Sequence, residues 1–173
     1  MSEALQALYE GDEERARQLL PRDGKLSVFE AAAFGRDERL AEILRADPAQ
    51  ASAFSDDGFT ALHLAIFGRQ EAAARVLLDA GADPNVLATS SFARVPPLGT
   101  AAFVQSVPLA RLLLDHGADP NRPGEGGFTA LHAAAQNGDE GLARLLLERG
   151  ADASVAADDG RRPADLGLAE LLA

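Results

Sequence analysis

The segment 58-GFTALHLAIFGRQEAAARVLLDAGADPN-85 recurs with few changes as 127-GFTALHAAAQNGDEGLARLLLERGADAS-154. Each copy holds an Ala- and Leu-rich segment, a short break, and a second Leu-rich segment that ends near Gly-Ala-Asp. Five residues mark the corresponding start of a unit along the chain: Ser27, Thr60, Pro96, Thr129 and Arg162. Their spacings are 33, 36, 33 and 33 residues, and a fixed period of this size is typical of stacked helical repeats.

The residues at the segment boundaries predict a pair of short antiparallel helices in each unit. Thr60 and Thr129 can cap the first helix through their hydroxyls. Pro97 and Pro163 stand at the next position of their units, where a helix needs no N–H. A glycine follows the second segment, as a left-handed helix stop requires: Gly81, Gly117 and Gly150.

Composition excludes several classes of protein. The 173 residues carry a net charge of −11, and the chain has one lysine, so phosphate backbones are repelled and nucleic-acid binding is not expected. The absence of cysteine rules out disulfides and thiolate metal sites. With no membrane-spanning apolar run and no signal-like N-terminus, we expect a soluble, cytoplasmic protein with no membrane association. A basic protein partner would be favoured by long-range attraction.

The motif T-A-L-H-x-A, followed by L-L-x-x-G-A-D-x-N at a 33-residue spacing, resembles the ankyrin repeat. The resemblance implies an all-α solenoid of stacked helix-turn-helix units, with connecting loops that project as β-turn fingers. It divides one domain, 1–173, into a degenerate N-terminal unit, four repeats and a C-terminal cap: 1–26, 27–57, 58–90, 91–126, 127–159 and 160–173. The Ala- and Arg-rich, lysine-poor usage indicates a bacterial source.

The polar residues of the motif are expected to be structural. The resemblance gives His63 and His132 the task of tying one loop to the adjacent finger, beside the capping residues Thr60 and Thr129. No histidine spacing suits a metal and no Gly-rich loop suits a phosphate, so we predict no metal, no cofactor and no enzyme activity. Paired acids at 56/57 and 158/159 fall in turns, where solvated carboxylates are common.

The aromatic residues are the candidate partner-binding residues, because Leu, Ala and Val suffice to fill the core of such a stack. One aromatic per unit falls near the end of the first helix, on the family's variable, groove-facing site: Tyr9, Phe34, Phe67 and Phe103. Four more fall in the fingers: Phe54, Phe59, Phe92 and Phe128. A contiguous apolar patch favours a binding surface, and the alternative is that these rings only pack on one another.

One finger is longer than the rest. From Asn85 to Pro96 it takes 11 steps, whereas the finger from Asn121 to Thr129 takes 8. The enlarged tip is apolar, with Arg94 as its one charge, and together with Phe92 this arginine is a candidate contact residue. Because loops tolerate insertions, drift without function is the alternative.

The resulting prediction is a non-enzymatic module that binds a partner protein, of unknown identity, through its concave groove and fingers. Two alternatives stay open at this point: a structural protein that associates with itself through the Phe-lined groove, and a small-ligand-binding protein or enzyme. The first alternative predicts a homodimer in solution, and the preferred reading predicts a monomer.

Overall fold

The computed structural model describes residues 2–21, 25–91 and 93–172 and shows an all-α protein of paired helices. The chain forms two compact units. Unit 1 comprises residues 1–83 with 89–91, and unit 2 comprises residues 84–88 with 92–173. The tip of the enlarged finger therefore clusters with unit 1, while its stem belongs to unit 2.

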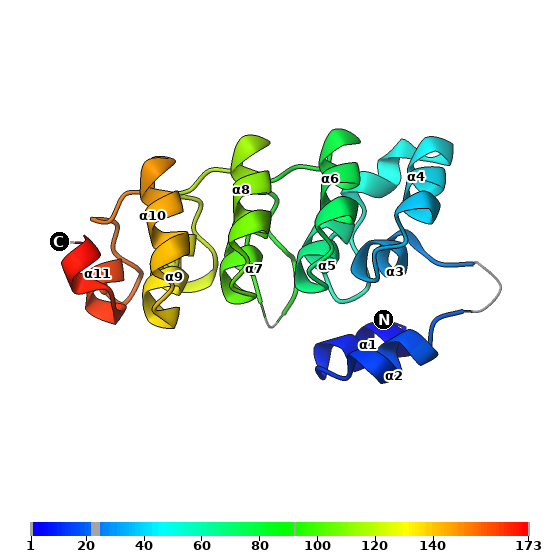
Figure 1. Cartoon of the computed structure of the whole chain (residues 1–173), viewed down its shortest axis with the longest axis horizontal. Coiled ribbons are helices and arrows are strands. Elements are labelled where there is room, and N and C mark those ends of the chain that lie inside the picture. The colour runs from blue at the N-terminus through cyan, green and yellow to red at the C-terminus, as the bar shows by residue number, and fades with distance from the viewer. Residues whose placement is uncertain (1, 22–24, 92, 173) are drawn as a thin grey trace. The chain divides into compact units, whose positions relative to one another are not determined.

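Unit 1 holds six α-helices and one 3-10 helix among its described residues (Figure 1): α1 (Glu3–Tyr9), α2 (Glu13–Gln18), α3 (Val28–Ala33), α4 (Asp37–Ala46), η1 (Pro48–Ser52), α5 (Ala61–Phe67) and α6 (Glu71–Asp79). Helix α3 packs on α5 and α4 packs on α6, so these two pairs stack as repeats. Pro48 stands where other units have the stop glycine, and α4 accordingly ends in η1 instead of a left-handed turn.

Unit 2 holds six α-helices and one 3-10 helix among its described residues: α7 (Pro97–Phe103), α8 (Val107–Asp115), η2 (Glu125–Gly127), α9 (Ala130–Asn137), α10 (Glu140–Glu148), α11 (Pro163–Leu166) and α12 (Ala169–Leu172). Helix α9 lies between α7 and α11, and α10 packs on α8. The second helices bury leucines such as Leu113 and Leu146, both 0% exposed. Burial of these apolar faces stabilises each helix pair against its neighbours.

In the two repeats of unit 1, the residue three positions after the start of the repeat braces the first helix by different chemistry. In α3, the Glu30 carboxylate accepts the backbone N–H of Ser27 at 3.0 Å, and the Ser27 hydroxyl accepts the Glu30 N–H, which completes a capping box. In α5, the Thr60 hydroxyl lies 2.8 Å from Nδ1 of His63. The capping box at Glu30 was not predicted from the sequence, although Ser-x-x-Glu is its usual signature.

Close backbone contacts fix the spacing between neighbouring repeats. A side chain on Gly68 would meet the Ala33 carbonyl at 2.1 Å, so only glycine lets α5 approach α3 this closely. In unit 2, the Asn137 side chain instead donates to the Ala102 carbonyl at 3.3 Å. At the equivalent position of the two repeats, Gly68 thus allows a close backbone approach and Asn137 forms a side-chain hydrogen bond to the preceding helix pair.

Asparagines at the finger bases repeat one bridge along unit 2. Asn85 Nδ2 donates to the Gly117 carbonyl at 3.0 Å, and Asn85 Oδ1 accepts the Asp119 N–H at 2.7 Å. Asn121 makes the same two bonds to the next repeat, at 2.9 and 2.7 Å. The final Asn of the G-A-D-x-N motif therefore holds successive repeats together, because it satisfies backbone groups of the turn that follows a second helix.

The described helices include none with the length and apolar character needed to cross a lipid bilayer.

Candidate functional site

The fingers are short hairpins, and the enlarged finger differs only at its tip. In three fingers a residue donates its N–H to the carbonyl four positions later: Ser55, Gly124 and Ala157. In the enlarged finger, the corresponding bond joins the Ala88 N–H to the Val95 carbonyl at 3.0 Å. The three additional residues therefore lie between Ala88 and Val95, where the sequence places them.

Part of the enlarged tip packs on the preceding finger. Thr89 donates its N–H to the Gly58 carbonyl at 2.8 Å, and Ser90 is only 2% exposed. A side chain on Gly58 would meet the Ser90 nitrogen at 2.5 Å, and Gly58 has φ of +86°, so glycine is required on both counts. The tip of the enlarged finger is thus partly internal.

Arg94 follows the tip and is exposed, as are Thr89 and Ser91 within it. The backbone of Arg94 is fixed, since the Glu125 N–H donates to the Arg94 carbonyl at 2.7 Å. Beside it lies a shallow pocket of about 330 Å³, lined by Leu87, Arg94, Asp158 and the turn 123–127. Phe92, the other predicted contact residue of this finger, lies outside the described residues.

Phe103 ends α7 with its ring largely in solvent. It is 71% exposed, whereas Phe54, at the start of a finger in unit 1, is 42% exposed. Phe34, at the end of α3, is half-buried. Of the predicted aromatic contact residues that the structure describes, Phe103 thus offers the largest accessible ring.

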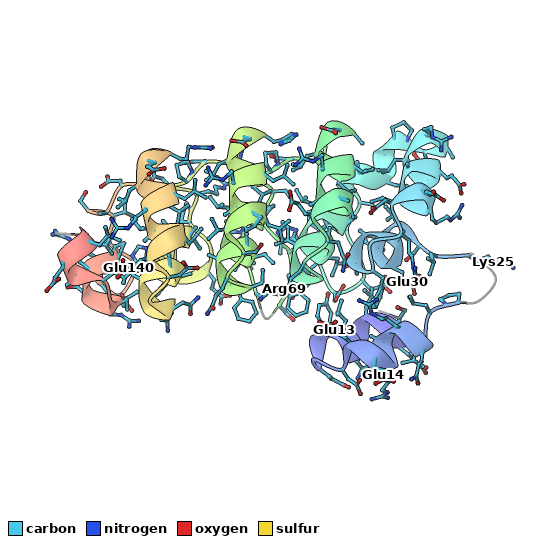
Figure 2. The ribbon with its side chains drawn as sticks, viewed as in Figure 1. Glu13, Glu14, Lys25, Glu30, Arg69 and Glu140 are labelled. Carbon is cyan, nitrogen blue, oxygen red and sulfur yellow. The ribbon has the colours of Figure 1, made fainter. Side chains whose placement is uncertain are left out.

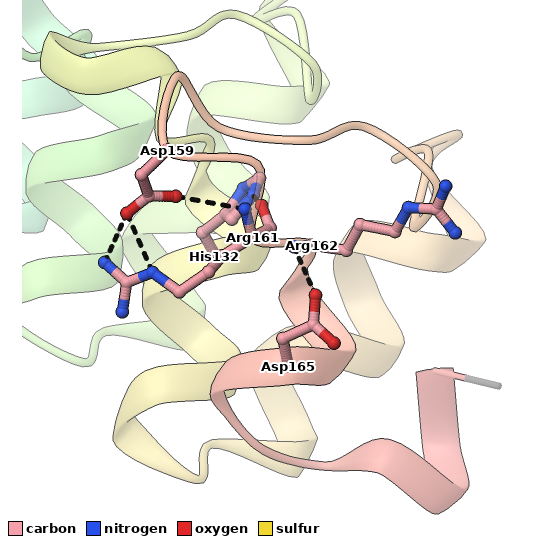
Figure 3. A network of polar contacts seen from close by, with 5 residues as sticks. All are labelled: His132, Asp159, Arg161, Arg162 and Asp165. Atoms are coloured by element: carbon pink, nitrogen blue, oxygen red, sulfur yellow. Dashed lines mark hydrogen bonds and ion pairs between the residues drawn. The ribbon is translucent and has the colours of Figure 1, made fainter.

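Phe128 packs against Arg161 and His132, which belong to the network of polar contacts in Figure 3. The Arg161 guanidinium lies 5.5 Å from the centre of its ring, and the His132 ring lies 5.1 Å from it. The Asp159 carboxylate holds Arg161 through an ion pair of 2.6 Å. A ring that packs against a cation and an imidazole contributes to stability, so the contacts of Phe128 are structural.

His132 links its repeat to the next finger. Its Nε2 lies 3.2 Å from the Arg161 carbonyl, and its Nδ1 lies 2.9 Å from the Thr129 hydroxyl. Burial is the main cause that lowers the pKa of His132, because an imidazolium loses its hydration there. In the last unit Asp165 stands at this position and accepts the Arg162 N–H at 2.8 Å (Figure 3).

Tyr9 packs against two other aromatic residues of unit 1 and does not stand separately on a groove-facing site. Its ring meets Phe67 edge-on at 5.2 Å and lies 6.1 Å from Phe59, and its hydroxyl donates to Asp57 Oδ2 at 2.8 Å. Phe59 is 8% exposed, so a partner cannot reach it while the Tyr9 ring lies against it. Asp57, expected to be a solvated turn residue, is half-buried and bonded.

The hydrogen bond between Tyr9 and Asp57 could not be predicted from the sequence, because the two residues are 48 positions apart. Burial and the neighbouring carboxylate both raise the pKa of Tyr9 above its ordinary value, with burial the larger cause.

Among the described side chains, no group of three or more His, Asp or Glu residues is arranged to hold a metal ion.

Paired helices that stack at a 33-residue period, joined by hairpin fingers, define the class of helical repeat proteins. The family model for ankyrin repeats (three copies) matches residues 1–88 and 91–157, and the chain belongs to the ankyrin-repeat family. Ankyrin repeats are in general modules of protein–protein interaction, and proteins built from them are typically non-enzymatic. No curated protein matches the chain.

Proposed function

We propose that the chain is a non-enzymatic module that binds a protein partner through unit 2, on a surface made by Phe103, Arg94 and the pocket beside the enlarged finger. The observation that carries the proposal is the Phe103 ring, 71% exposed at the end of α7. Aromatic and arginine side chains dominate the binding free energy of protein interfaces. Both residue types stand here on helix and hairpin elements that the repeat stack holds in place.

The length of α7 allows a single segment of the partner to contact both Arg94 and Phe103. Helix α7 has 7 residues, and at 1.5 Å per residue it is about 10 Å long. Arg94 precedes this helix and Phe103 ends it, so one segment of the partner can contact both ends. The net charge of −11 favours a partner with a basic surface, because long-range attraction accelerates the encounter.

Affinity capture followed by mass spectrometry tests the proposal, with Phe103→Ala as the first variant. Loss of an exposed anchor should weaken capture of the specific partner by about 1 to 4 kcal/mol and leave the fold intact. Gln136→Ala is the matched control, because Gln136 stands seven residues after Thr129, as Phe103 stands seven after Pro96, and is also exposed. Equal capture by wild type, Phe103→Ala and Arg94→Ala would overturn the proposal.

Light scattering separates this proposal from self-association through the same ring. A partner-binding module should stay monomeric as its concentration rises. A dimer that Phe103→Ala dissociates would instead assign the exposed ring to contacts between copies of the chain.

A further inference from the structure

The contacts of Tyr9 place the N-terminal helix pair on the face of unit 1 and not at the end of its stack. Neighbouring helices pack about 8 to 10 Å apart. A stacked first unit would therefore hold Tyr9 two steps, about 20 Å, from the equivalent residue Phe67. The two ring centres lie 5.2 Å apart instead, and α1 packs on α3 (Figure 1). Helix α1 thus covers part of the α3–α5 face, and α2 packs on α1.

Three groups form the seat in which Tyr9 lies. Phe67 meets its ring edge-on, at an interplanar angle of 73°, and Phe59 supports it from the finger. The Asp57 carboxylate receives the phenol hydrogen at 2.8 Å, and its other oxygen is bonded to the Ser55 hydroxyl. The seat therefore accepts an aromatic ring at its apolar wall and a hydroxyl donor at its far end.

The helix pair is held by a small set of contacts. Its helices have 7 and 6 residues, and helices this short are marginal without packing. Helix α1 buries two alanines and two leucines, while α2 buries only Ala16. The acidic side of α2, with Glu13 and Glu14, faces solvent (Figure 2). Detachment of this pair would therefore expose far less apolar surface than loss of a stacked repeat.

We propose that the seat formed by Asp57, Phe59 and Phe67 is a binding site for an amphipathic helix that presents a tyrosine, and that α1–α2 is its tethered, displaceable occupant. A partner helix of the same chemistry competes with the chain's own segment for the α3–α5 face. The tether gives α1–α2 an effective concentration in the millimolar range, so the partner must bind more tightly than α1–α2 alone. This site concerns unit 1 only and does not depend on the surface proposed for unit 2.

The direct test uses a fluorescently labelled synthetic peptide of residues 2–20, added to the full chain and followed by anisotropy. Wild type should bind it weakly, because its own Tyr9 fills the seat. The full-length Tyr9→Ala variant should bind it at least tenfold more tightly, since the internal competitor has lost its anchor. Adding Asp57→Asn to that variant should weaken peptide binding several-fold.

The same peptide carrying Tyr9→Ala is the matched control, and it should compete at least tenfold less well than the natural peptide. Equal binding of the peptide by wild type and Tyr9→Ala, or binding indifferent to Asp57→Asn, would overturn the proposal.

Hydrogen exchange on the wild-type chain provides a test that needs no variant. A displaceable α1–α2 should exchange its amide hydrogens at least tenfold faster than α5. Protection of α1 equal to that of α5 would show that the pair opens only when unit 1 unfolds, and would exclude a displaceable occupant.

Discussion

Phe67 and Phe103 stand at the same position of two repeats, seven residues after Thr60 and Pro96, yet they have different surroundings. Phe67 is half-buried and receives the Tyr9 ring of the same unit. Phe103 is 71% exposed. The residue type and its place on the helix are the same, so what lies over the face decides whether the ring is structural or accessible. In unit 1 the covering element is α1 of the chain itself.

The largest effects are expected from truncation of a buried leucine in each unit. These variants test whether the second helices of both units are equally well buried, although the exposure of the two phenylalanines differs. Leu77 on α6 and Leu113 on α8 are both 0% exposed. Leu77→Ala and Leu113→Ala should each lower the free energy of unfolding by about 2 to 5 kcal/mol, measured by urea denaturation. A loss below about 0.5 kcal/mol at either site, the range of surface substitutions, would place that leucine outside the core.

Replacement of His132 should cost less, because it removes hydrogen bonds and leaves apolar packing in place. His132→Gln should lower stability by about 1 to 3 kcal/mol and leave partner capture intact, since the residue is 0% exposed. Loss of capture at an unchanged melting temperature would contradict the structural role.

The same histidine predicts a pH dependence of stability. The pKa of His132 is lowered in the folded state, so the unfolded chain binds the proton more readily. Stability should therefore fall as the pH drops below the ordinary value of 6.5 toward the folded-state pKa. His132→Gln should remove this part of the decline, which thermal melts at a series of pH values would detect.

Alanine substitution of the two equivalent phenylalanines measures the difference between the faces directly. Phe67→Ala should cost about 1 to 2 kcal/mol, less than the 3 to 5 kcal/mol of a fully buried phenylalanine, because the residue is half-buried. Phe103→Ala should change stability by less than about 0.5 kcal/mol. Equal costs in chemical denaturation would mean that α1 adds nothing to the packing of Phe67.

The smallest effect is expected at the Tyr9 hydroxyl. Tyr9→Phe removes one hydrogen bond to Asp57 and should loosen α1–α2 by about 1 kcal/mol, seen as faster amide exchange in α1. Because the folded-state pKa of Tyr9 is raised, α1–α2 should also loosen as the pH rises above the ordinary value of 10.0. Tyr9→Phe should abolish that alkaline loosening, and loosening that persisted in the variant would assign it to another group.

Asp57→Asn keeps the shape of the seat, and amide exchange in α1 of this variant should lie between that of wild type and that of Tyr9→Phe. The chain has a single tyrosine and no tryptophan, so tyrosine emission reports on this contact alone. A spectrum unchanged by Asp57→Ala, which removes the acceptor, would contradict the hydrogen bond.

The all-α repeat fold could be predicted from the sequence, because the signals that define it are local. A hydroxyl at Thr60 caps the helix that begins at the next residue, and Gly81 has φ of +90° where the following helix ends. Such choices depend on backbone conformation within one turn, and the 33-residue period repeats them. The position of the insertion in the enlarged finger followed from the same alignment of equivalent residues.

The surroundings of each aromatic residue could not be predicted from the sequence and follow from the packing of the folded chain. Phe59 is interior, Phe128 lies under Arg161, and Tyr9 lies in a seat built from residues 48 to 58 positions away. No local rule fixes these outcomes, because burial depends on which surfaces meet when the chain collapses. The α1–α2 pair shows the physical reason. Its two helices can be predicted from the sequence, but its position depends on the free energy gained when α1 covers the α3–α5 face instead of extending the stack.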